Sequence, residues 1–178
     1  MEKINLKGNT MCIKDLYEKG TSLFQKTEDV PLLFLRVILA YTFFTPGLMK
    51  AKDIQSTANF FEYLGIPLPT LNAYMAAGTE LVGAVLLAFG LLTRFISVPL
   101  LFVMLVAIAT VHGANGFHVI LPDSGWDNPF VNGEEIKGTV VVLQNGYEMV
   151  LYYMAMLMVL VGKGAGRLSL DFLLFKKA

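Results

Sequence analysis

The chain has 178 residues, of which 55% are hydrophobic and 16% charged, with a formal net charge of zero and a mean hydropathy of +0.59. Soluble domains carry about 25% charged residues, so this composition excludes an ordinary soluble domain and predicts one all-α membrane domain. The charge balance provides no basic face for nucleic acid. With a single cysteine, Cys12, the chain cannot form internal disulfides or CxxC redox pairs.

Residues 1–30 form a polar N-terminal segment that lacks the apolar core of a signal peptide. We expect this segment to be cytoplasmic. Its apolar side chains predict some amphipathic helix around Leu16, Tyr17, Leu23 and Phe24. The alternative is a helix that lies on the membrane surface or docks a partner.

Four apolar stretches follow, at about 31–49, 70–92, 95–112 and 147–162. A membrane-spanning helix needs about 20 apolar residues, so these stretches predict a four-transmembrane-helix bundle whose fourth helix is short. The Gly65–Pro69 stretch breaks the helix between the first two spans. Gly90 marks a tight turn after the second span, so the second and third spans should form an antiparallel hairpin.

Lysine and arginine residues outside these spans are distributed unevenly. Ten lie in the N-terminal segment, in the turn after the second span and in the tail, whereas three lie on the other side. By the positive-inside rule, this asymmetry places both termini in the cytoplasm. The chain therefore divides into a cytoplasmic N-terminal segment (1–30), a membrane domain (31–171) and a cytoplasmic tail (172–178).

The one long connection, from Gly113 to Gly146, lies between the third and fourth spans on the outer side. Thr139–Leu143 is almost entirely β-branched and predicts a strand, and Asn132-Gly133 is a hairpin turn signal before it. We expect a long outer loop with a small β-hairpin over the outer mouth of the bundle. Loops of this length are uncommon unless they are functional or disordered.

Ionisable side chains within the apolar spans are the main functional signal, because a charge in hydrocarbon costs at least about 2.5 kcal/mol and persists where it meets a partner, water or a ligand. Glu80 lies mid-span on a helical stripe of small residues, the face that packs against other helices. Near the outer mouth lie Lys50, His112, Tyr147 and Glu148, and deeper toward the cytoplasm lies Arg36. We expect one of the two glutamates to pair with Lys50 or His112.

Most of these residues also have a plainer interpretation. Lys50 is a common kind of interface anchor, Arg36 a structural or snorkelling charge, and Glu148 a solvated helix end. His112 and His118 with Glu148 offer a zinc or copper site as an alternative, although nothing in the sequence fixes its geometry. Of these residues, only Glu80, in the middle of its span, favours a functional or tightly paired role over a plainer one.

Six short pieces occur along the chain in a fixed order. They are Gly47-Leu48-Met49-Lys50, Glu80-Leu81-Val82-Gly83, Gly90-Leu91-Leu92-Thr93-Arg94, Val111-His112-Gly113-Ala114-Asn115-Gly116-Phe117, Gly146-Tyr147-Glu148 and Gly166-Arg167-Leu168-Ser169-Leu170-Asp171. In this order they resemble the DoxX family of small four-helix bacterial membrane proteins, over about residues 32–171. The family is named after a subunit associated with quinone-linked thiosulfate oxidation.

The resemblance implies a multi-pass protein of the bacterial inner membrane and a role as part of a quinone-linked oxidoreductase. It also implies a polar core made of Arg36, Lys50, Glu80, His112, Asn115 and Glu148. The chain departs from the family pattern at Pro46 and in the longer connection between Phe117 and Gly146. The longer connection points to a different outer substrate or partner.

The leading hypothesis is a redox-associated subunit that binds a quinone or a similar small molecule in a polar pocket in the outer half of the bundle. The candidate proton-relay groups are Glu80, His112 and Glu148. The candidate ligand-binding residues are Arg36, Lys50, Asn115 and Tyr147, with Lys50 placed to polarise a carbonyl oxygen. The sequence assigns no metal, and a quinone is the candidate cofactor.

Two alternatives stay open. A non-enzymatic membrane scaffold would recruit a soluble partner through its termini or through Trp126, Phe130 and Val140–Val142. A small transporter would use the charges to line a path, although no inverted repeat is visible. Beyond the lipid bilayer, we expect either a protein partner or a second copy of the chain.

Overall fold

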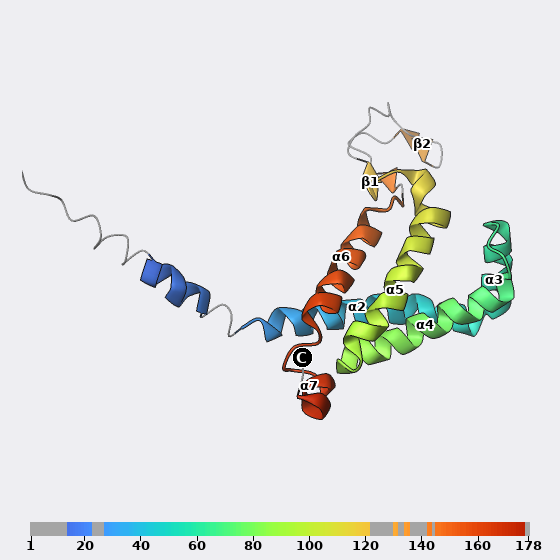
Figure 1. Cartoon of the computed structure of the whole chain (residues 1–178). Helices are drawn as coiled ribbons and strands as arrows, with labels where there is room; N and C mark the ends of the chain where they lie inside the picture. The colour runs from blue at the N-terminus through green and yellow to red at the C-terminus, as the bar shows by residue number, and fades with distance from the viewer. Residues whose placement is uncertain are drawn as a thin grey trace, which may run out of the picture.

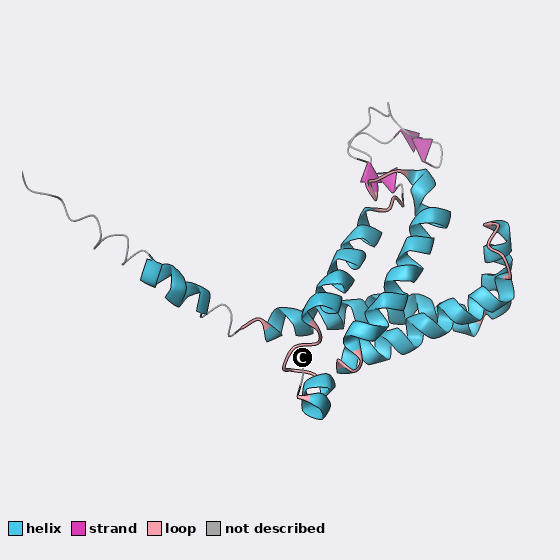
Figure 2. Cartoon of the chain, in the orientation of Figure 1, coloured by secondary structure: helices cyan, strands magenta, loops and turns pink. Residues whose placement is uncertain are grey.

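The computed structural model describes residues 14–22, 27–121, 130–131, 134–135, 142–143 and 145–176. Figure 1 shows the chain from its N-terminal helix (14–22) to its C-terminal helix, and Figure 2 shows that helices dominate the fold. The labelled helices are α2 (Asp29–Lys52), α3 (Ile54–Tyr63), α4 (Pro69–Phe89), α5 (Thr93–Ala107), α6 (Glu148–Lys163) and α7 (Leu170–Phe175). A π-helical turn η1 (Ile108–His112) and a 3₁₀ turn η2 (Gly113–Asn115) continue α5.

Local sequence signals set the helix ends. Pro69 is the first residue of α4, where its missing N–H leaves no hydrogen bond unmade. Gly90 ends α4 with a φ of 65°, a left-handed conformation that glycine adopts without strain. Asp53 separates α2 from α3, and its side chain accepts a hydrogen bond from the backbone N–H of Ser56 at 2.9 Å. The predicted helix break at Gly65–Pro69 is confirmed.

Two elements of the fold are absent from the sequence-based prediction. The amphipathic helix α3 begins two residues after α2 ends and packs against α4. The sequence pattern misses it because the apolar run ends at Lys50, and the short helix that follows is only weakly apolar. The π-helical turn η1 shifts the face of the helix on which His112 lies, and such turns are frequent at functional sites.

The helices form two pairs that cross toward one end and diverge toward the other. Helix α2 packs along α4, and α5 packs along α6, while Figure 1 shows the second pair rising steeply from the first. We call the end with the α4–α5 turn the turn end, and the end with Lys50 and His112 the open end. A buried cluster joins the four helices toward the turn end: Leu32, Leu39, Ala40, Phe43, Ala84, Leu87, Leu100, Leu157 and Leu160.

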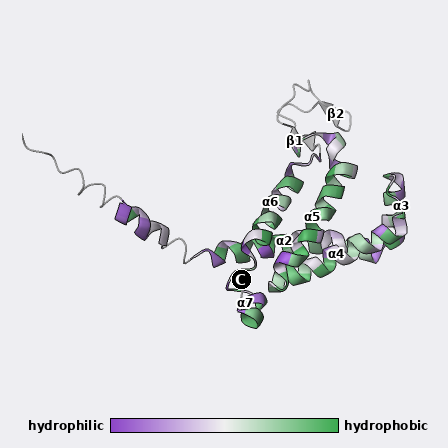
Figure 3. Ribbon diagram, in the orientation of Figure 1, coloured by the Kyte–Doolittle hydropathy of each residue, from purple (hydrophilic) through white to green (hydrophobic). Residues whose placement is uncertain are grey.

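Three of the described helices are long and apolar enough to cross a membrane: Asp29–Lys52, Pro69–Phe89 and Thr93–Asn115. Large apolar side chains such as Phe34 and Phe95 are exposed on them, and Figure 3 shows the apolar character of these helices. Exposed apolar surface of this extent indicates contact with lipid or with a partner. Helix α6 has 16 residues, about 24 Å of helix against roughly 30 Å of hydrocarbon. The helical fold class is confirmed, and the fourth span and the topology stay predictions.

The connection between η2 and α6 is described in part. The strands are two residues long: β1 (Ile120–Leu121) pairs antiparallel with β4 (Val142–Leu143), and β2 (Phe130–Val131) with β3 (Glu134–Glu135). The predicted strand is described only in its last two residues, those of β4. The predicted turn at Asn132-Gly133 lies outside the described residues.

Several other sequence-based predictions also fall outside the described residues. The N-terminal helix includes Leu16 and Tyr17, both exposed, whereas Leu23 and Phe24 are not among the described positions. The same holds for Trp126 and for the first two residues of Val140–Val142. The hairpin cap and the scaffold contacts therefore stay predictions.

Candidate functional site

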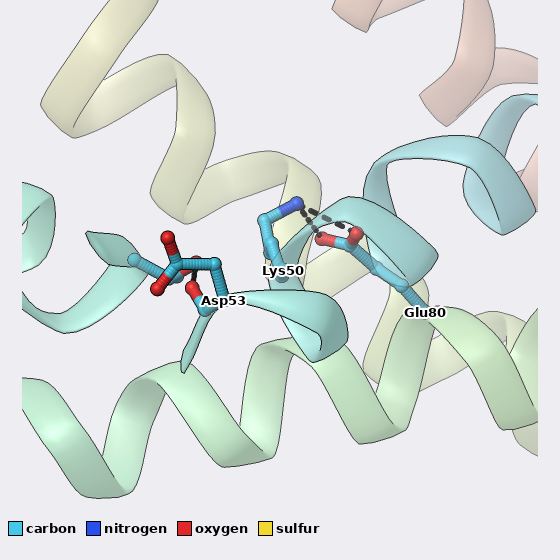
Figure 4. Close-up of polar contacts among 4 residues, drawn as sticks. Lys50, Asp53 and Glu80 are labelled. Carbon is cyan, nitrogen blue, oxygen red and sulfur yellow. Dashed lines mark hydrogen bonds and ion pairs between the residues drawn. The ribbon is translucent and has the colours of Figure 1, made fainter. Parts of the chain in front are cut away.

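Lys50 and Glu80 form an ion pair between α2 and α4 at the open end. The Lys50 Nζ lies 2.9 Å from Glu80 Oε1 and 2.7 Å from Oε2, as Figure 4 shows. The Glu80 side chain is 4% exposed and that of Lys50 is 25% exposed. Asp53, labelled in the same view, caps α3 and takes no part in the pair. Of the pairings left open by the sequence, Glu80 with Lys50 is the one formed.

A glycine brings the two helices close enough for this pair. A Cβ built at Gly47 would lie 2.9 Å from the Glu80 Cβ and 3.1 Å from the backbone nitrogen of Leu81. Any larger residue at this position would therefore push α2 away from α4. Close approach through small residues is the usual way in which membrane helices pack. The Gly47-Leu48-Met49-Lys50 piece thus supplies both the contact and the cation.

A cavity of ≈ 600 Å³ lies between the two helix pairs at the open end. Lys50 and Glu80 line it from the α2–α4 side, and His112 lines it from η1. Most of the other lining side chains are apolar, among them Phe43, Pro46, Phe60, Phe61, Met75, Phe102, Val103 and Met149. An apolar cavity with a few polar groups is the usual form of a small-molecule site. The structure therefore brings three of the predicted site residues to one cavity.

The imidazole of His112 is held by the chain just before α6. Its Nδ1 lies 2.9 Å from the backbone oxygen of Asn145. Because a carbonyl oxygen only accepts hydrogen bonds, Nδ1 carries the proton, and in the neutral ring Nε2 keeps its lone pair. The side-chain amide of Asn115 also donates to the Asn145 oxygen, at 3.3 Å, and to the Val111 oxygen, at 3.4 Å. Asn115 thus supports His112 from outside the cavity lining.

Glu148 and Tyr147 organise the start of α6 and are not among the residues that line the cavity. The hydroxyl of Tyr152 donates to Glu148 Oε1 at 2.6 Å, and the backbone N–H of Val119 donates to Oε2 at 3.3 Å. The ring of Tyr147 meets that of Phe117 edge to face, with centroids 5.5 Å apart. These contacts fix the chain around Val119, which does line the cavity.

Arg36 lies toward the turn end, away from the cavity. Its side chain is fully buried, and Nη2 donates to the backbone oxygen of Leu168 at 2.5 Å. Among the described residues, Nε and Nη1 have no hydrogen-bond partner. A Cβ built at Gly90 would overlap Arg36 Nη1, so only glycine leaves room for the guanidinium. The structure therefore separates Arg36 from the other predicted site residues.

The C-terminal segment explains two of the short sequence pieces. The carboxylate of Asp171 accepts hydrogen bonds from the backbone N–H groups of Leu92 and Thr93, at 2.8 and 3.0 Å, at the start of α5. Its own backbone N–H donates to the Gly90 oxygen at 3.0 Å. The piece that begins at Gly90 and the piece that ends at Asp171 are therefore in contact. Their role in the structure is to close the turn end.

Sequence reasoning misses several residues that line the cavity. Phe60 and Phe61 come from α3, which the sequence does not predict, and Thr79 and Thr110 carry no distinctive pattern. The contribution of Asn145 is a backbone oxygen, which no side-chain pattern reveals. A sequence signal for the start of α3 is Asp53, a favoured N-cap residue, whose side chain accepts a hydrogen bond from the backbone N–H of Ser56.

The metal alternative gains no support from the geometry. Among the described residues, no group of three or more histidine, cysteine, aspartate or glutamate side chains is placed to hold a metal ion.

The fold and the site define a small helical protein with helices of membrane length and an apolar cavity that holds an ion pair and a histidine. The DoxX family model matches residues 31–113. An uncharacterised protein of Haemophilus influenzae is 33% identical over 151 residues, which cover 83% of this chain and 85% of that protein. The chain belongs to the DoxX family.

A second relative has a name that refers to an activity. The Bacillus subtilis protein named "Putative oxidoreductase CatD" is 41% identical over 86 residues, which cover 48% of this chain and 63% of that protein. No solved structure matches the chain significantly.

Proposed function

We propose that the protein spans the bacterial inner membrane several times, with both termini in the cytoplasm, and binds a quinone or a similar small apolar molecule as a redox-associated subunit. The three apolar helices of membrane length support the insertion. The excess of lysine and arginine on one side supports the topology. Helix α6 is the fourth span in this proposal, and its shortness requires little tilt or local thinning of the bilayer.

The observation that carries the proposal is the shared cavity of Lys50, Glu80 and His112. Quinone chemistry requires proton-exchanging groups beside the carbonyl oxygens and an apolar slot for the tail. In the proposed site, Glu80 and His112 exchange protons, and Lys50 polarises a carbonyl oxygen. The name of the Bacillus relative supports a redox setting.

The remaining predicted residues take supporting roles in this proposal. Glu148 acts through Val119 and the start of α6, and Asn115 and Tyr147 hold the same region. Arg36 secures the turn end by its bond to Leu168. The proposed ligand contacts therefore reduce to Lys50, with the two proton-exchanging groups beside it.

Native mass spectrometry of the protein in nanodiscs tests this function. The wild-type chain should retain a quinone or another small molecule of membrane origin. Thr79→Phe should abolish this retention, because Thr79 lines the cavity and a phenyl ring there fills it. Val82→Phe is the matched control: this residue lies one turn further along α4, is 55% exposed and does not line the cavity.

Two outcomes would argue against the proposal. Equal retention by wild type and Thr79→Phe would place the ligand outside the cavity. A chain that carries no small molecule and instead brings down a second protein would favour the scaffold alternative.

A further inference from the structure

The polar groups of the cavity discriminate between molecules that fit it equally well. We infer that the cavity selects an uncharged head group that bears a hydroxyl, so that of a lipid-soluble quinone and its hydroquinone, the hydroquinone binds more tightly. This inference rests on the proposed function, because it specifies the ligand of the same cavity.

The ion pair makes the cavity electrically neutral. Lys50 Nζ contacts both carboxylate oxygens of Glu80, at 2.9 and 2.7 Å, so the two charges cancel within the wall. The other ionisable side chains that line the cavity are His112 and Tyr153. An anionic head group would thus bring an uncompensated charge into an apolar space, which is costly. A carboxylate or a sulfur oxyanion is disfavoured on this ground.

His112 presents a hydrogen-bond acceptor. Its Nδ1 proton is committed to the Asn145 oxygen at 2.9 Å, and Asn115 donates to that same oxygen at 3.3 Å. In the neutral ring, Nε2 therefore accepts and does not donate. Among the described residues, no donor to Nε2 is present. A ligand that fills the cavity without donating a hydrogen bond leaves this nitrogen without a partner.

Lys50 presents the matching donor. An ammonium group has three N–H bonds, and the two contacts to Glu80 leave one for a ligand oxygen. A hydroxyl both donates and accepts, so a hydroquinone satisfies His112 and Lys50. A quinone carbonyl only accepts, so it satisfies Lys50 alone. The threonines and Asn72 in the lining both donate and accept, and they do not distinguish the two forms.

The test measures binding of three probes to the full-length protein in nanodiscs, with empty nanodiscs as the partition control. The probes are a decyl-substituted hydroquinone under anaerobic reducing conditions, the corresponding quinone, and decanoate, all at mildly alkaline pH. One hydrogen bond between a ligand and the protein changes affinity by up to about tenfold. We therefore expect the hydroquinone to bind about tenfold more tightly than the quinone, and decanoate to show no saturable binding.

Two histidine variants locate the preference. His112→Phe should reduce the affinity for the hydroquinone to that for the quinone. His118→Phe should keep the preference, because His118 is exposed and does not line the cavity. The comparison of probes on the wild-type chain decides the matter by itself if His112→Phe fails to fold.

The contradicting results are distinct. Three results would overturn the inference and leave the cavity as a binding site. They are a quinone that binds the wild-type chain at least as tightly as the hydroquinone, saturable binding of decanoate, and a preference for the hydroquinone that persists in His112→Phe. Absence of saturable binding by all three probes would overturn the proposed function together with the inference.

Discussion

Lys50 and Glu80 tolerate an apolar setting because each neutralises the other. The glutamate is almost fully buried, and its two oxygens share one ammonium group. Removing one partner of such a pair leaves an uncompensated charge, whereas replacing both with apolar side chains of similar size is often nearly neutral. The stability of the open end therefore depends on the pair as a unit.

Lys50→Met should lower the free energy of unfolding by about 3–5 kcal/mol, because it leaves Glu80 buried and unpaired. The double variant Lys50→Met with Glu80→Leu should recover most of this loss while abolishing ligand binding. Lys52→Met, at an exposed position two residues further along α2, is the matched control and should change little. Denaturation in detergent measures the free energy of unfolding of all three variants. A double variant no more stable than Lys50→Met would contradict the view that the two charges stabilise the fold only as a pair.

Gly90→Ala should destabilise the protein by more than about 1 kcal/mol. The new Cβ would collide with the Arg36 guanidinium, and the φ of 65° is itself unfavourable for alanine. Gly78→Ala, in open space on the same helix, should be neutral or stabilising because alanine favours helix. Since Gly90 lies at the turn end, away from the cavity, the folded Gly90→Ala variant should bind the ligand as tightly as the wild type. Thermal unfolding measures the stability, and equal midpoints for Gly90→Ala and Gly78→Ala would contradict the close contact between Gly90 and Arg36.

At the scale of elements, each end of the bundle is closed by a segment outside the long helices. The C-terminal segment closes the turn end, where Asp171 bonds the first N–H groups of α5. Helix α3 closes one side of the open end, where Phe60 and Phe61 line the cavity. Its start depends on the Asp53 cap.

Asp53→Ala should loosen α3 by about 1 kcal/mol, the usual cost of losing a helix cap. Amide hydrogen exchange in residues 54–63 should then accelerate by about fivefold. Asp53→Asn should leave exchange close to that of the wild type, because asparagine caps equally well. Equal acceleration in both variants would mean that the negative charge, and not the cap, orders α3.

At the scale of the whole molecule, the long helices and their order follow from apolar runs and helix-breaking residues in the sequence. The depth of the charges in the predicted bundle narrows the ion pair to Glu80 or Glu148 with Lys50 or His112. Periodicity gives the face of a helix but not its neighbour, so the choice depends on how the two helix pairs cross. The sequence already places Arg36 deeper toward the cytoplasm, yet leaves it among the candidate ligand-binding residues; only its bond to Leu168 shows its structural role at the turn end.

Helix α3 and the partners of Glu148 were not predicted, for two other reasons. Helix α3 is short and only partly apolar, so no membrane-length pattern marks it. Glu148 was grouped with the cavity residues because it shares their depth, whereas the structure directs its carboxylate to Tyr152 and Val119. Depth along a helix therefore predicts the region of a side chain but not its partner.

The predicted topology has a direct readout in the single cysteine, Cys12. A membrane-impermeant maleimide should label it only after spheroplasts are permeabilised, because both termini are expected in the cytoplasm. A variant that carries Cys12→Ser and Lys52→Cys should be labelled in intact spheroplasts, since position 52 is expected on the outer side. The reverse pattern would invert the topology.

Photo-crosslinking of an azido-substituted quinone to the wild-type protein in nanodiscs, followed by peptide mapping, tests most directly whether the cavity binds such a molecule. We expect labelling at cavity-lining positions on α4 and α5 that are only partly exposed, such as Thr79 and Val103, and loss of this labelling when unlabelled quinone is added in excess. Labelling confined to outward positions such as Phe34 and Phe95, and unaffected by excess quinone, would contradict the claim that the cavity binds such a molecule.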